Sequence, residues 1–155
     1  MEITYRLAGG PNAIGWEHRY NCATAPRADL LWSFFPGDIG IKEGEDGFET
    51  NFGLIPILHF SLSMIAIYES LSKVGDVTER YIFTEADESL SFRRSGEAVL
   101  IEPSFSPIRI ISQMAAMRVA VKSFTERVIS DLGSAYPPLL ENVFIDEMVT
   151  KANDL

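Results

Sequence analysis

An uncharged stretch of nineteen residues, Thr50–Tyr68, constrains the fold more than any other part of the sequence. A membrane-spanning helix needs about twenty predominantly apolar residues. Here the apolar residues are interrupted by Asn51, Gly53, Pro56, His59, Ser61 and Ser63. The unbroken apolar pieces are therefore too short for a membrane span, and we expect no membrane contact.

The same stretch fits a buried amphipathic helix that begins at Pro56, a residue suited to the first turn of a helix. A narrow stripe along this helix comprises His59, Ser63, Ala66, Ser70 and Lys73. Apolar side chains such as Ile57 and Met64 occupy the rest of the circumference, which is typical of a mostly buried helix. Gly75 follows as a candidate C-cap. The pattern predicts a core helix over Pro56–Lys73.

A second long helix is predicted over Pro107–Leu132, because Ser106 and Pro107 suit an N-cap and a first turn. The apolar stripe of this helix comprises Met114, Met117, Val121, Phe124, Val128 and Leu132. Gly133 and the prolines that follow end it. A shorter helix is predicted over 138–152. One side of this last helix carries Leu139, Leu140, Val143, Phe144 and Met148.

The remaining segments predict strands. We expect strands over 3–9, 16–21, 29–35, 39–44 and 47–52, with the Pro-Gly-Asp sequence at 36–38 as a hairpin turn. Three more strands are expected within 80–105. In the second of these Leu90 and Phe92 share one face, and the third, which contains Leu100, is predicted to be central. The order of elements predicts an α+β domain, with the two long helices and the shorter C-terminal helix packed on one face of an antiparallel sheet.

The chain has 155 residues, 46% of them hydrophobic and 23% charged, which is typical of one globular domain spanning 1–155. The single cysteine, Cys22, excludes an internal disulfide framework and suits a reducing compartment. The first ten residues show no basic region followed by an apolar region, as a signal peptide would. We therefore expect a cytoplasmic protein.

The formal net charge is −9, and most of it lies in two segments. Asp38–Glu49 holds five acids against Lys42, and Asp76–Glu102 holds seven acids against three arginines. The candidate partner-binding acids are Glu43, Glu45, Asp46 and Glu49 in the first segment and Glu85, Asp87 and Glu88 in the second. They either keep the chain in solution as solvated turn residues or form a field complementary to a basic partner. Direct binding to nucleic acid is disfavoured, because no basic patch is present.

The sequence contains no motif that fixes a chemistry. No phosphate-binding loop and no metal-ligand spacing is found, so we expect no metal and no cofactor. His18 and Cys22 would stand roughly 13 Å apart on an extended strand, too far for a catalytic pair. His59 is interpreted as a structural histidine, and exposed turn acids do not separate their pKa values as acid–base catalysis requires. The residues support no enzyme class.

Two passages in this small acidic chain carry a resemblance to a known class. The strand-to-helix passage "IKEGEDGFETNFGLIPILHFSLSMIAIYESL" and the hairpin "LSFRRSGEAVLIEP", followed by a closing helix, resemble small bacterial immunity-type proteins. Such proteins accompany secreted or contact-delivered toxins, many of them basic nucleases. The resemblance implies binding to a cognate toxin that blocks or distorts its active site. It carries over no functional residue.

Three hypotheses remain open at this stage. The chain neutralises a toxin through its acidic loops. Alternatively, it binds or transforms a small molecule in a pocket between sheet and helices, using His59 or Tyr68. In the third hypothesis it is an oligomeric structural or adaptor subunit, in which the last helix or an exposed strand makes the interface.

Overall fold

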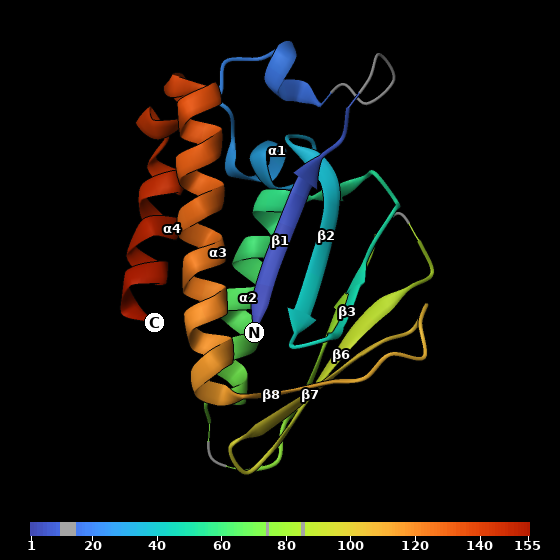
Figure 1. Ribbon diagram of the computed structural model, residues 1–155. Coiled ribbons are helices and arrows are strands. Elements are labelled where there is room, and N and C mark those ends of the chain that lie inside the picture. Colours follow the sequence, from blue (N-terminus) through green and yellow to red (C-terminus); the bar gives the residue numbers. More distant parts are fainter. Residues whose placement is uncertain (10–14, 74, 85) are drawn as a thin grey trace.

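A layer of helices packs on two antiparallel sheets in the computed structural model, which describes residues 1–9, 15–73, 75–84 and 86–155 (Figure 1). The elements are β1 (Glu2–Leu7), the 3-10 turn η1 (Trp16–His18), α1 (Arg27–Trp32), β2 (Pro36–Glu43), β3 (Asp46–Glu49), β4 (Ile55–Pro56), α2 (Ile57–Leu71), β5 (Thr78–Ile82), β6 (Ser89–Ser95), β7 (Ala98–Pro103), β8 (Ile110–Gln113), α3 (Met114–Ala135), the 3-10 turn η2 (Pro137–Glu141) and α4 (Val143–Asp154).

The strands form two sheets of four strands each. In sheet A the order is β1-β2-β3, and β4 pairs with Pro36 and Gly37 at the start of β2. In sheet B the order is β5-β6-β7-β8. All pairs are antiparallel. The predicted α+β class is confirmed, and β7 has a partner on each side as expected. The single sheet that we expected is divided into two.

Two tight hairpins depend on glycine. The pairs Glu43–Asp46 and Ser95–Ala98 each leave a loop of two residues. The first loop residues, Gly44 and Gly96, have φ of 59° and 61°. Glycine adopts this left-handed conformation without steric cost. Glycine is therefore favoured in the two-residue loops of hairpins.

The helices α2 and α3 form the centre of the core. Six apolar residues of the predicted long helices and of the second strand within 80–105 are buried as expected: Ile57, Met64, Phe92, Met114, Val121 and Phe124 are each at most 6% exposed. Leu100 is only half-buried, because Val99 and Ile101 on either side of it point inward. The hydroxyl groups of Ser61 and Thr125 lie 2.9 Å apart in this core, so α2 and α3 also share a buried polar contact.

Two predicted elements have the wrong secondary structure. Residues 29–35 lie mostly in α1 rather than in a strand, and the expected turn at 36–38 lies within β2. The predicted helix over Pro107–Leu132 begins only at Met114, because Ile110–Gln113 pairs with β7 as strand β8. Short apolar runs fit a helix and a strand equally well, and here the tertiary pairing decided.

Smaller differences concern the ends of elements. Residues 16–18 form a 3-10 turn and not a strand. The helix α2 ends at Leu71 rather than at a cap on Gly75. Arg94 explains this ending, because its guanidinium donates to the carbonyl oxygens of Leu71, at 2.7 Å, and Lys73, at 3.0 Å. No helix among the described residues is long and apolar enough to cross a membrane.

The predicted last helix is divided at Asn142 into η2 and α4 (Figure 1). The Asn142 side chain caps α4 by accepting from the Phe144 amide at 3.0 Å. Its Nδ2 group donates to the carbonyl oxygens of Cys22 at 2.8 Å, Ala23 at 3.2 Å and Ala25 at 3.0 Å. The buried Asn142 side chain therefore links the segment before α1 to the C-terminal helix α4 through hydrogen bonds. Leu139, Phe144 and Met148 are buried as expected, whereas Leu140 and Val143 are exposed.

We predict that Asn142→Asp destabilises the protein by about 3 kcal/mol or more, because a carboxylate would replace the amide donor opposite three carbonyl oxygens. Asn142→Ser is the matched control, since serine caps a helix about as well as asparagine or aspartate. It should lose about 1–2 kcal/mol, through the missing donor alone. Urea unfolding of the three proteins measures the difference. Wild-type stability of Asn142→Ser would show that the carbonyl contacts contribute nothing, and equal stability of the two variants would show that the carboxylate adds no repulsion.

Candidate functional site

The candidate partner-binding acids of the first acidic segment lie at the outer, solvent-facing side of sheet A. Side chains alternate between the two faces of a strand. Ile3, Ile39, Ile41 and Phe48 point toward the helices and are at most 8% exposed. The opposite, outer face carries Glu2, Thr4, Arg6, Asp38, Gly40, Lys42, Gly47 and Glu49.

The strand register arranges these outer residues in rows. Thr4 lies opposite Gly40, and Gly40 lies opposite Glu49 on β3. In the next row Glu2 lies opposite Lys42, which in turn faces Gly47. Each row has a glycine in it, so the face is hollow between its longer side chains.

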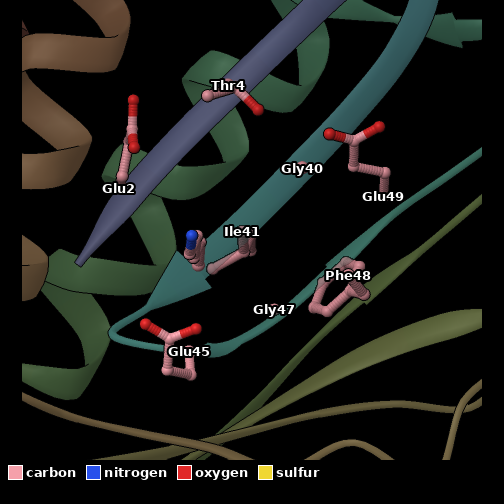
Figure 2. Close-up of a pocket in the computed structure, with 9 residues that line it drawn as sticks. Glu2, Thr4, Gly40, Ile41, Glu45, Gly47, Phe48 and Glu49 are labelled. Atoms are coloured by element: carbon pink, nitrogen blue, oxygen red, sulfur yellow. The ribbon is translucent and has the colours of Figure 1, made fainter.

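Two adjoining depressions follow these rows. The larger has a volume of about 400 Å³ and is lined by Glu2, Thr4, Gly40, Ile41, Lys42, Glu45, Gly47, Phe48 and Glu49. Figure 2 shows Glu2, Glu45 and Glu49 standing around a floor that contains Gly40 and Gly47. The second depression has a volume of about 290 Å³ and shares Thr4, Gly40 and Glu49 with the first. Three carboxylates and one lysine thus surround the larger depression.

The glycines are required by the packing of this face. A Cβ atom on Gly40 would lie 2.7 Å from Oγ1 of Thr4 and 3.2 Å from Cγ of Glu49. A Cβ atom on Gly47 would lie 3.0 Å from the carbonyl oxygen of Ile41. Glycine inside a strand commonly marks a place of close approach. Here it lowers the floor of the depression.

The four acids predicted in the first segment divide into two kinds. Glu45, Asp46 and Glu49 are exposed. Glu43 is half-buried, pairs with the amino group of Met1 and accepts from Oγ of Ser112 at 3.3 Å. Glu43 therefore links sheet A to β8 of sheet B, and three free acids remain on or beside the β2–β3 hairpin.

The second acidic segment lies at the far end of β6 from Glu43. Asp87 is exposed, Glu88 is half-buried and accepts from the Ser104 hydroxyl, and Glu85 lies outside the described residues. Glu88 precedes the first residue of β6, whereas Ser112, the contact of Glu43, aligns through β7 with Arg94 near the other end of β6. Six residues of strand span roughly 20 Å, so Glu88 is far from Glu43. Phe48, the neighbour of Glu49, packs against Phe105, which follows Ser104, so sheet A approaches the start of β6 on the side of Glu49.

Asp38 also borders the second depression, but it is engaged in the fold. Its Oδ1 accepts from the Thr50 hydroxyl at 3.1 Å and from the Gly53 amide at 2.9 Å. The Thr50 hydroxyl in turn accepts from the Ile39 amide at 2.9 Å. Asp38 therefore orders the connection that leads from β3 toward α2, and it is not a free acid.

His59 belongs to an aromatic cluster. Its ring lies 4.0 Å, centroid to centroid, from that of the exposed Trp32, and Nδ1 is 3.3 Å from the Tyr81 hydroxyl. Burial lowers the pKa of His59 and raises the pKa of Tyr81, so both are neutral at pH 7. Tyr68 is half-buried and packs against the core. His59 is thus tied to its neighbours as a structural histidine would be.

His18 and Cys22 do not form a catalytic pair. Cys22 is buried, and burial together with the negative charge of Glu17 raises the pKa of its thiol. A thiolate nucleophile requires the opposite shift. The exposed His18 lies 3.6 Å from the carboxylate of Glu17. In the described parts of the chain, no group of three or more His, Cys, Asp or Glu side chains is placed to hold a metal ion.

The sequence did not indicate the contribution of Glu2 and Lys42 to this site. Their alternation on β1 and β2 is visible in the sequence, but only the strand pairing sets one beside the other. Comparison of the chain with protein-family models, with curated proteins and with solved structures found no match. The function is therefore argued from the residues of this site.

We predict that Asp38→Ala destabilises the protein by about 1–3 kcal/mol, because it leaves the Gly53 amide without its acceptor and removes one of the two acceptors of the Thr50 hydroxyl. Glu49→Ala, on the same face, should change stability by less than about 0.5 kcal/mol, as exposed substitutions usually do. Urea unfolding midpoints at pH 7 measure both. A Glu49→Ala variant as unstable as Asp38→Ala would mean that the hairpin acids serve the fold.

Proposed function

We propose that the protein is a non-catalytic protein-binding domain of the immunity type, which neutralises a basic toxin through the acidic face of sheet A. The supporting observation is that Glu45, Asp46 and Glu49 are exposed together on one hairpin, beside a depression that Glu2 also borders. The resemblance in layout to small bacterial immunity-type proteins points to the same role. We further propose a cytoplasmic location, which the single cysteine fits.

The physical form of the site favours a basic protein as its partner. Exposed carboxylates on a rigid hairpin act over several ångströms, steer a basic partner and orient it during the encounter. The depression over Gly40 and Gly47 offers space for a lysine or arginine side chain of the partner between Glu2, Glu45 and Glu49. Lys42 on the same face would repel a wrongly placed cation and so contributes to the register of docking.

The direct test is co-expression with the products of the neighbouring genes, one of which is a toxin if the proposal is correct. If the proposal holds, the chain restores growth of cells that express the toxin, and the two proteins copurify at equal amounts. Continued toxicity in the presence of soluble, folded chain, together with no measurable complex, would falsify it.

We predict that the triple variant Glu45→Gln, Asp46→Asn, Glu49→Gln associates with that toxin about tenfold more slowly at low salt. Its association rate should also depend less on salt, because exposed charges are screened within about 8–10 Å at physiological ionic strength. The matched control neutralises three exposed acids elsewhere, Glu69, Glu126 and Glu141, which gives the same net charge. Biolayer interferometry at several salt concentrations measures both variants.

Glu43 is left unchanged in this variant because it links the two sheets. Equal slowing by the control would attribute the effect to net charge alone. An unchanged rate in the hairpin variant would place the interface elsewhere on the protein.

A further inference from the structure

The outer face of sheet B has a different character from that of sheet A. Its outward side chains include Arg80 and Ile82 of β5, Arg93 of β6, Leu100 and Glu102 of β7, and Ile111 of β8. We call these six residues the arginine face. Their inward neighbours, such as Phe92, Val99 and Ile101, are fully buried against the helices.

The register sets apolar and basic side chains next to each other on this face. Arg93 lies opposite Leu100, and Leu100 lies opposite Ile111, in one row across three strands. In the adjacent row Arg80 lies opposite Ser91, which lies opposite Glu102. Successive outward residues on a strand are about 7 Å apart. The two rows therefore form one compact patch.

The apolar members of the arginine face are unusually exposed. Ile111 is 65% exposed and lies beside the half-buried Leu100, while Ile82, which is 63% exposed, lies two rows away at the end of β5. The solvated face of an antiparallel sheet is normally polar. Large apolar side chains that gather on such a face mark an interaction surface more often than isolated ones do.

The charge of this face is opposite to that of the chain. Arg80, Arg93 and the neighbouring Arg109 are exposed, while Glu102 is the one outward acid of the face, in a protein of net charge −9. Among the described residues, the ion pairs of this surface are limited to Arg109 with Glu102, at 2.9 Å. The acids Asp87, Glu88 and Glu97 lie in the connections at the ends of β6, beyond the patch.

Within the described parts of the chain, Arg93 makes no structural hydrogen bond comparable to those of Arg94. Arg94 points inward and caps α2 through the carbonyl oxygens of Leu71 and Lys73. Arg93 is exposed and lies on the outer row between Thr78 and Leu100. Arg80 and Arg93 are therefore available to carboxylates from another molecule.

We propose that the arginine face binds an acidic, extended protein segment. Carboxylates of the segment pair with Arg80 and Arg93, and its apolar side chains cover Leu100 and Ile111. When acidic and apolar residues take turns at every second position of an extended chain, their side chains point to the same side about 7 Å apart, which matches the spacing of the rows. A second copy docked face to face would oppose arginine to arginine, and a phosphate backbone would leave the apolar side chains of Leu100 and Ile111 uncovered.

The test uses the full chain and a synthetic peptide in which glutamate and valine take turns at every second position, with serine between them, and the same peptide carrying lysine for glutamate is the comparison. Titration of isotope-labelled protein, followed by amide chemical shifts, should give saturable changes on β5–β8 with the glutamate peptide. The Arg80→Glu, Arg93→Glu variant should bind it at least about tenfold more weakly. The control reverses two exposed arginines outside this face, Arg19 and Arg118, and should leave the affinity unchanged.

Ile111→Ser separates the apolar contribution from the charge, and it should weaken binding severalfold without altering the salt dependence. No saturable binding, equal binding of the lysine peptide, or equal loss in the control overturns the proposal. So does tighter binding of a single-stranded oligonucleotide at the same residues. Concentration-dependent self-association in sedimentation, abolished by Arg80→Glu and Arg93→Glu, would assign the face to a second copy. None of these outcomes depends on the hairpin acids, so the proposed toxin interface is tested separately.

Discussion

The structure depends on the burial of most of one helix, α2. Its residues 57–68 carry no formal charge, and the helix contacts α1, α3, α4 and strands of both sheets. Phe60 is fully buried and packs edge to face against Tyr81 of sheet B, at 5.1 Å, and Phe124 of α3, at 5.7 Å between ring centroids. A helix surrounded on so many sides must be apolar around most of its circumference. Its few polar groups then need partners inside the protein, as Ser61 finds in Thr125.

The two sheets are joined beside this helix by aromatic rings. Phe48 of β3 packs edge to face against Phe105, at 5.5 Å, and Phe52 packs against both Phe83 and Phe105. The contact of Glu43 with Ser112 adds a polar link. Because the inner faces of both sheets are fixed in this way, their outer faces are rigid surfaces in solvent. One has three carboxylates around its larger depression and the other carries exposed arginines. The fold therefore presents one surface suited to a basic partner and one suited to an acidic partner.

The acids of this chain thus have two separate roles. Asp38 and Glu43 are bound to other parts of the fold, and so is Glu17, which accepts from the Phe35 amide at 3.0 Å. Phe35 has a φ of 52°, an uncommon conformation for an aromatic residue, and Glu17 holds its amide at the point where the chain enters β2. Glu45, Asp46 and Glu49 have no such task in the described residues, and this difference singles them out as candidates for binding.

The sequence by itself determined the features that depend on local order. It specified α2 through its apolar circumference, β6 and β7 through their alternation, and the closeness of Glu45, Asp46 and Glu49 through their places on one hairpin. Residues 29–35 and 107–113 were predicted wrongly. Short apolar runs fit both the helical and the strand periodicity, and long-range contacts settle which of the two structures forms. The division into two sheets and the depression between Glu2 and Glu49 followed only from strand register. Register joins residues far apart in the chain, and no local pattern encodes it.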